Sequence, residues 1–189
     1  MELQKAISER RSYRCFADKK VFPIEMKEIL EAGIFAPSPK NRQPWHFYSC
    51  GPRHKGRVAD ILKSKIAEMQ AASVNVGSLP TSLGAIEECS DLVLVYNRYS
   101  KREHGDNENR WKADILSIGA CIQNMLLTAH SKNIQSLWIC DILFAEKEIS
   151  DLMATGDELV SGVAFGIGTQ GLLPPRPRME LHKKMCKTG

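Results

Sequence analysis

The chain has 189 residues, of which 43% are hydrophobic and 25% are charged, and its formal net charge is +4. This composition is typical of an ordinary globular protein, and the mild positive charge suits an anionic cofactor but is too weak to indicate a nucleic-acid partner. No apolar run is long enough to span a membrane and the first residues do not form a secretion signal, so we expect a cytoplasmic protein without membrane contact.

The domain organisation is expected to be simple. One domain is predicted over residues 1–189, with an extended tail from about residue 172. The six cysteines include no Cys-x-x-Cys pair, so the usual spacing of structural zinc and iron–sulfur sites is missing and we expect no metal. In a reducing compartment these cysteines are expected to be mostly buried small hydrophobic residues.

The N-terminal half of the sequence indicates helices and one strand. Apolar residues at helical spacing and flanking prolines predict the helices, and an alternating aromatic run closed by Gly51-Pro52 predicts the strand. The expected elements are helices at residues 2–11, 24–35 and 54–73 and a strand at residues 45–50. A segment rich in Gly, Ser, Pro and Thr at residues 74–82 is expected to be a loop.

The C-terminal half adds short apolar runs and a long central helix. The expected elements are strands at residues 91–97, 136–140 and 160–167 and helices at residues 111–132 and 145–154. Residues 99–112 are highly charged and are expected to form a solvated surface loop, with a lid as the alternative. The mixed order favours an α+β fold with a central, mostly antiparallel sheet flanked by helices.

The segment Arg10-Arg11-Ser12-Tyr13-Arg14 is the first of three candidate binding segments. Its guanidinium and hydroxyl groups are the donors that a phosphate and a sugar-like chain require. A solvated basic helix end, where cations meet the helix dipole, is the alternative interpretation.

The second candidate segment runs from Ala36 to Phe47 and contains three prolines and a Trp. Prolines remove backbone donors and fix φ, so this segment is expected to be a stiff loop. Its polar side chains, among them Ser38 and Asn41, suit a flat ligand rich in heteroatoms. A rigid surface turn remains the alternative.

The third candidate segment is Gly171-Leu-Leu-Pro-Pro-Arg-Pro-Arg178. Alternation with proline keeps the backbone extended and presents Arg176 and Arg178 on one side of it. The alternative is a disordered basic tail.

Together these three segments resemble the motifs of the nitroreductase family of flavin enzymes, and the resemblance covers nearly the whole chain. Ala-Pro-Ser-Pro-Lys-Asn-Arg-Gln-Pro-Trp is similar to the family's Pro-Ser-x-x-Asn-x-Gln-Pro-Trp motif, and the helix over residues 114–132 with the following Ser136-Leu-Trp-Ile-Cys-Asp141 is similar to its core helix and flavin-side strand. The resemblance implies an intertwined homodimer that binds two FMN molecules at the interface.

The resemblance also implies which residues contact FMN. These residues are Arg10, Arg11, Ser12, Arg14, Pro37, Ser38, Pro39, Asn41, Ile139, Cys140, Asp141, Arg176 and Arg178. The arginines at both ends of the chain would hold the phosphate, with Arg14 near N1 of the flavin, and the proline-rich loop would reach the flavin bound mainly to the partner. Pro39 departs from the family pattern by removing a backbone donor, and Cys140-Asp141 stands where Gly or Glu is common.

The function that the resemblance implies is an FMN-dependent NAD(P)H oxidoreductase that reduces nitroaromatics, quinones or related small acceptors by a ping-pong mechanism, with NADH or NADPH as the donor. Because the redox chemistry belongs to the flavin, no side chain is expected to be catalytic. The alternatives are a flavin-destroying dimethylbenzimidazole synthase, a dehalogenase, a flavin-binding protein without turnover and, from the basic tail alone, a nucleic-acid binder.

Overall fold

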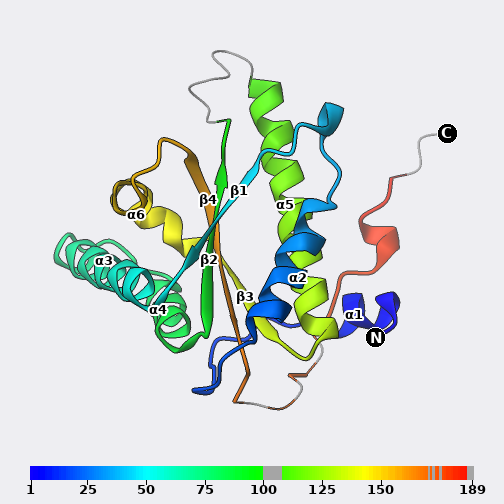
Figure 1. Ribbon diagram of the computed structural model, residues 1–189, viewed down its shortest axis with the longest axis horizontal. Coiled ribbons are helices and arrows are strands. Elements are labelled where there is room, and N and C mark those ends of the chain that lie inside the picture. The colour runs from blue at the N-terminus through cyan, green and yellow to red at the C-terminus, as the bar shows by residue number, and fades with distance from the viewer. Residues whose placement is uncertain (100–107, 170, 172, 175, 187–189) are drawn as a thin grey trace.

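The computed structural model describes residues 1–99, 108–169, 171, 173–174 and 176–186. Its centre is a four-stranded sheet in the order β1-β2-β4-β3, in which each neighbouring pair is antiparallel (Figure 1). The strands are β1 (Trp45–Cys50), β2 (Asp91–Asn97), β3 (Gln135–Ile139) and β4 (Glu158–Gly166). The predicted α+β class with an antiparallel sheet is therefore confirmed.

Helices cover both faces of the sheet (Figure 1). One face carries α2 (Pro23–Ile34) and α5 (Glu108–Ser131), and the other carries α3 (Pro52–Ala71), α4 (Leu79–Glu88) and α6 (Glu146–Met153). Successive residues of β2 point to opposite faces: Val93 and Val95 pack in the α2–α5 core, whereas Leu92 and Leu94 pack in the other. All four are fully buried, which explains why β2 is a continuous apolar run.

Helix α5 is the central helix that the sequence predicts. It is buried along one side by residues such as Ile118, Ile122 and Met125, and α2 packs directly on it. A Cβ built at Gly33 of α2 would lie 2.9 Å from Met125 Cγ and 3.0 Å from Cys121 Sγ, so a glycine permits this close approach of the two helices. The short α1 (Leu3–Glu9) also contacts α5.

Several sequence expectations need correction. Residues 74–82 are not all loop, because α4 begins at Leu79 with Pro80 in its first turn, a position where proline fits a helix. Within the charged segment 99–112, residues 108–112 belong to α5, and residues 100–107 lie outside the described residues. Strand β3 ends at Ile139, which leaves Cys140 just beyond it at the start of a 3-10 helix, η2 (Asp141–Ala145).

The cysteine expectation was half right. Cys50, Cys89 and Cys121 are buried, whereas Cys15, Cys140 and Cys186 are exposed. In the part of the chain that the structure describes, no three His, Cys, Asp or Glu residues are placed to hold a metal ion. The described helices likewise include none with the length and apolar character needed to cross a membrane.

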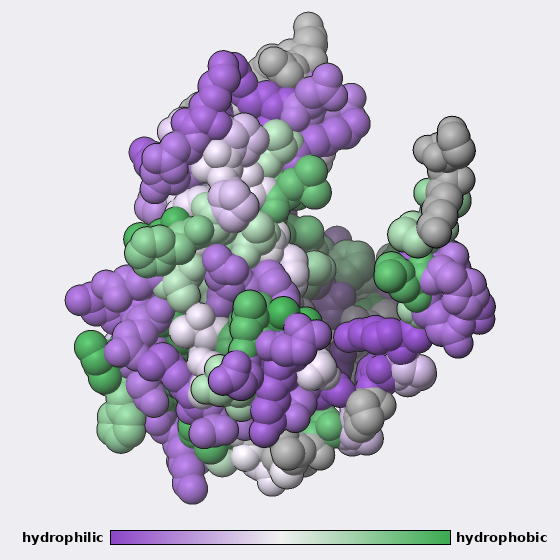
Figure 2. Space-filling view, turned by 90° about the vertical axis from the view of Figure 1, so that its right-hand side faces the viewer, coloured by the Kyte–Doolittle hydropathy of each residue, from purple (hydrophilic) through white to green (hydrophobic). Residues whose placement is uncertain are grey.

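The chain end forms an arm that stands apart from the body. It includes a short 3-10 helix, η3 (Leu181–Lys183), and exposes Met179, Leu181 and Met185. Figure 2 shows the surface hollowed between this arm and the rest of the molecule. The apolar side chains of this arm are uncovered in the single chain.

Candidate functional site

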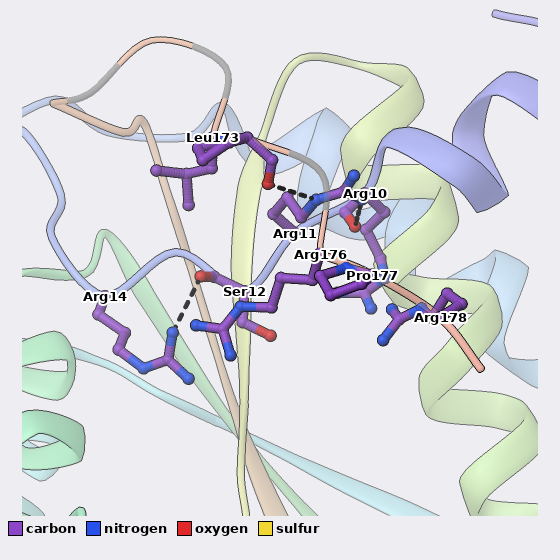
Figure 3. A pocket seen from close by; sticks show the side chains of 9 residues that line it. Arg10, Arg11, Ser12, Arg14, Leu173, Arg176, Pro177 and Arg178 are labelled. Carbon is purple, nitrogen blue, oxygen red and sulfur yellow. Dashed lines mark hydrogen bonds between the residues drawn. The ribbon is translucent and has the colours of Figure 1, made fainter.

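A cavity of about 520 Å³ lies where the two ends of the chain meet at the edge of the sheet (Figure 3). Its lining comes from one segment near the N-terminus and one from the tail. The lining residues are Arg10, Arg11, Ser12, Arg14, Leu173, Pro174, Arg176, Pro177 and Arg178. The structure therefore brings the first and third candidate segments together, and we call this cavity the arginine pocket.

The N-terminal wall of the arginine pocket is held by the open edge of β3. Ser12 forms a parallel bridge with Ser136, and the Tyr13 amide donates to the Ser136 carbonyl oxygen at 3.1 Å. Further along, the Ala17 amide donates to the Ile167 carbonyl oxygen at 2.7 Å. Tyr13 is buried against the core, whereas Arg14 is exposed. Because the backbone here is extended, successive side chains point alternately into the protein and towards the cavity.

The arginine pocket carries excess positive charge. Its lining includes five arginines and, among the described residues, no carboxylate. Burial is the largest cause that lowers the pKa of Arg10, and the nearby charges of Arg178 and Arg11 lower it further. Cations held close together without a carboxylate among them favour the binding of an anion, and guanidinium groups fit phosphate oxygens in particular.

Arg11 differs from the other described arginines of the pocket because its guanidinium binds backbone of both the N-terminal segment and the tail. Its Nη1 donates to the carbonyl oxygens of Ser8 at 2.7 Å and Arg10 at 2.8 Å, and its Nε donates to that of Pro174 at 3.2 Å. Arg11 therefore joins the end of α1 to the tail. The sequence motif alone gave no sign of this bracing role, because Pro174 is distant in the chain.

The proline-rich loop lies elsewhere. Its 3-10 turn η1 (Pro39–Asn41) sits beside the N-terminal end of α5, whereas α1 lies near the other end of that helix (Figure 1). Helix α1 leads directly into Arg10 of the arginine pocket. Within one chain the structure does not bring Pro37, Ser38, Pro39 or Asn41 to the arginine pocket. A separate cavity of about 420 Å³ borders the loop, lined by Pro39, Lys40, Arg42, Asn109, Arg110, Ala113 and Asp114.

The loop has a strained backbone. Lys40, Asn41 and Gln43 have φ values of 54°, 53° and 49°, in the left-handed region that L-residues rarely adopt. The Gln43 amide donates to Ser38 Oγ at 2.9 Å, so this hydroxyl supports the turn. Such strain persists only where the surroundings impose it and is common at functional sites.

The residues at the end of β3 and just beyond it divide between core and surface. The Ile139 side chain is buried, so this residue would face a ligand only through its backbone, whereas Cys140 is exposed. The Asp141 carboxylate accepts hydrogen bonds from the hydroxyls of Ser78 and Ser82, both at 2.6 Å. Asp141 thus ties the start of α4 to η2, a contact that the sequence did not predict because α4 was not recognised.

The residues of the arginine pocket fit FMN, the cofactor that the resemblance implies. A cavity of about 520 Å³ lies within the usual range of about 300–1,000 Å³ for small-molecule sites. Its cluster of guanidinium groups matches a terminal phosphate, and Ser12 adds a hydroxyl donor.

Fold and pocket together define a small α+β protein with an anion-suited pocket at the edge of an antiparallel sheet. Residues 7–167 match the family model described as Nitroreductase family, and the chain belongs to that family. The predicted family and the predicted class, an oxidoreductase, are confirmed by this match.

Individual relatives agree with this family assignment. The chain is 31% identical over 138 residues to an Archaeoglobus fulgidus protein provisionally named NADH dehydrogenase/NAD(P)H nitroreductase. The matched stretch covers 73% of this chain and 67% of the relative. A Desulfovibrio desulfuricans structure, provisionally called a nitroreductase and solved with FMN, matches with a TM-score of 0.75 and 25% identity over 100% of this chain and 98% of that one. A BluB-like flavoprotein from Clostridium difficile 630 matches with a TM-score of 0.80 and 24% identity over 100% of both chains, which supports the fold.

Proposed function

We propose that this protein is an FMN-dependent NAD(P)H oxidoreductase that reduces nitroaromatics, quinones or related small acceptors in a ping-pong cycle. The observation that carries the proposal is the arginine pocket, in which five guanidinium groups surround a cavity of about 520 Å³. The FMN in the Desulfovibrio relative and the NAD(P)H in the name of the Archaeoglobus relative support the choice of cofactor and electron donor.

Five of the nine lining residues have a proposed part in holding FMN. Arg10, Arg176 and Arg178 bind the phosphate, and the Ser12 hydroxyl adds a donor. Arg14 lies beside Ser12, to whose carbonyl oxygen its Nη1 donates at 3.3 Å, and its charge offsets negative charge near N1 of the reduced ring. When bound, FMN supplies the redox chemistry, taking a hydride from NAD(P)H and passing electrons to the acceptor.

We further propose that the protein acts in the cytoplasm as a homodimer of single-domain subunits, with the loop of Pro37, Ser38, Pro39 and Asn41 contacting the partner's flavin. The support is that the loop and α1, which leads into the arginine pocket, lie at opposite ends of α5 in one chain (Figure 1). Large apolar side chains are also uncovered on this chain, among them Phe35 at 83% and Leu116 at 75% exposure. A second copy of this chain would bury such apolar surface in a dimer interface.

The absorption spectrum of the purified protein tests the cofactor. We expect flavin bands that bleach under nitrogen on addition of NADH or NADPH and return with a nitroaromatic or a quinone. Absence of flavin bands, with no binding of added FMN, would overturn the proposal. Bleaching without recovery of the flavin would instead favour a flavin-destroying activity, and bands that NAD(P)H leaves unchanged would favour a binding protein without turnover.

A mixed dimer tests the shared site. One subunit carries Arg176→Ala with Arg178→Ala, and the other carries Ser38→Ala with Asn41→Ala. If the loop serves the partner, one of the two sites in the mixed dimer has an intact pocket and an intact loop, so it retains FMN although both parent dimers bind poorly. If the loop serves its own subunit, both sites in the mixed dimer are defective and no FMN is regained.

Sedimentation provides the simpler control. We expect the FMN-loaded protein to sediment at about twice the chain mass of 21.2 kDa. A loaded protein that remains a monomer would contradict the shared site while leaving the cofactor assignment standing.

A further inference from the structure

Arg42 connects the strained loop to two other parts of the fold. Its Nε lies 3.2 Å and 3.1 Å from the two carboxylate oxygens of Asp114, and its guanidinium carbon lies 3.7 Å from the centroid of the Tyr99 ring. Asp114 is fully buried within α5, and Tyr99 follows the end of β2. The Arg42 side chain is therefore held on one side by a buried carboxylate and on another by an aromatic face.

The loop's own hydrogen bonds fold it back on itself. The Asn41 amide donates to the Ser38 carbonyl oxygen at 3.0 Å, and the Arg42 amide donates to that of Pro39 at 3.2 Å. These bonds close a tight turn, but they do not join it to α5. The Arg42 side chain makes that connection through Asp114.

The position of Arg42 within the loop is informative. Its own backbone is right-handed helical, with φ −68° and ψ −28°, while Asn41 before it and Gln43 after it are left-handed. A change of conformation at either neighbour would swing the Arg42 side chain away from Asp114 and Tyr99. The two contacts of Arg42 thus oppose relaxation of the strained residues on both sides.

We propose that Arg42 is a positioning residue that fixes the strained loop and so sets how Ser38 and Asn41 are presented to flavin. The part that concerns flavin rests on the function proposed above. Arginine suits this role better than lysine, because a planar guanidinium can bind a carboxylate and stack on an aromatic ring at the same time. Arg42 acts through the loop and needs no contact with the flavin itself.

Hydrogen exchange of the flavin-free protein tests whether Arg42 fixes the strained loop. In Arg42→Met we expect the amides of Asn41, Arg42 and Gln43 to exchange at least tenfold faster, since each bond depends on the closed turn. Arg42→Lys should lie between wild type and Arg42→Met. Arg53→Met, which removes an exposed arginine from α3, is the matched control and should leave these amides unchanged.

Unchanged exchange at these three amides in Arg42→Met would overturn the positioning role. Tyr99→Leu provides a second route if Arg42→Met does not fold, because it removes the stacking partner and keeps the ion pair. Under the proposal Tyr99→Leu by itself also speeds exchange of the loop, and unchanged exchange in Tyr99→Leu would count against the positioning role. Where Arg42→Met folds, adding Tyr99→Leu to it has little further effect.

Titration with FMN tests whether the loop that Arg42 fixes contributes to flavin binding. If the competent loop conformation falls to about a tenth of the population, the apparent Kd for FMN rises about tenfold in Arg42→Met, while turnover at saturating FMN stays within about twofold. Faster exchange with an unchanged Kd would overturn the link to flavin. A wild-type protein that binds no FMN would overturn the proposed function, and the exchange result would still decide whether Arg42 positions the loop.

Discussion

Arg11 and Pro174 are 163 positions apart in the sequence, yet Arg11 Nε donates a hydrogen bond of 3.2 Å to the Pro174 carbonyl oxygen. This bond closes the arginine pocket by holding the tail against the N-terminal segment (Figure 3). The two tail arginines that line the pocket, Arg176 and Arg178, lie two and four positions after Pro174, so their placement depends on it.

Arg11→Ala should therefore release the tail. We expect trypsin to cleave after Arg178 several-fold faster than in the wild type, because cleavage requires backbone that has come away from the folded protein. The same digestion followed by mass spectrometry provides the measurement. Arg14→Ala is the control, since Arg14 bonds within its own segment; equal tail cleavage in all three proteins would show that Arg11 does not hold the tail.

Removing the tail arginines should abolish retention of FMN. A hydrogen bond to a charged group contributes about 1.5–3 kcal/mol, so Arg176→Ala with Arg178→Ala is expected to weaken FMN binding by at least about a hundredfold. Equilibrium titration monitored by flavin fluorescence measures the change. Lys183→Ala with Lys184→Ala removes the same charge from the exposed end of the tail and should leave affinity nearly unchanged, and unaltered binding in the arginine variant would remove the phosphate assignment.

His130 gives an expected dependence of stability on pH. His130 is 8% exposed, and its Nε2 has no hydrogen-bond partner among the described residues. Burial is the largest cause that lowers its pKa; the charge of Glu9 opposes this shift, and the charges of Arg10 and Arg11 add to it. The folded state thus favours neutral His130 more than the unfolded state does. This contribution is complete above the unfolded pKa of about 6.5 and is lost as the pH falls below it.

His130→Gln should therefore lose less stability than the wild type between pH 7.5 and 5.5. Thermal unfolding at both pH values measures the two differences, and His54→Gln, at an exposed position of α3, is the matched control. A pH dependence that is the same in all three proteins would show that His130 does not titrate differently in the folded and unfolded states.

The cysteines should separate into two classes. Burial raises the pKa of Cys50 to about 11 and those of Cys89 and Cys121 to about 12, while Cys15, Cys140 and Cys186 are exposed. Because the thiolate is the reactive form, we expect a thiol reagent at pH 8 to label the exposed residues and to reach the other three only after unfolding. Peptide mapping assigns the labels, and rapid labelling of Cys121 would contradict its place in the core.

Much of the fold followed from local pattern. The expected strands at residues 45–50 and 91–97 coincide with β1 and β2, because each is a run of strand-forming residues between clear breaks. Helix α4 was missed because Pro80 and the Gly and Ser residues before it are typical of loops. Only packing distinguishes a proline in a first helical turn from one in a loop, and here Leu79 and Ile86 are fully buried.

The sequence by itself determined which kinds of group the protein carries: guanidinium donors near both ends and a proline-stiffened polar loop. The tertiary structure decided which of them meet. Arg10 and Arg178 share a pocket because Ser12 pairs with the free edge of β3 and Arg11 holds Pro174, whereas α5 separates this pocket from the loop. Those pairings depend on the register and packing of distant segments, which no local pattern contains, and the same is true of the contact of Arg42 with Asp114.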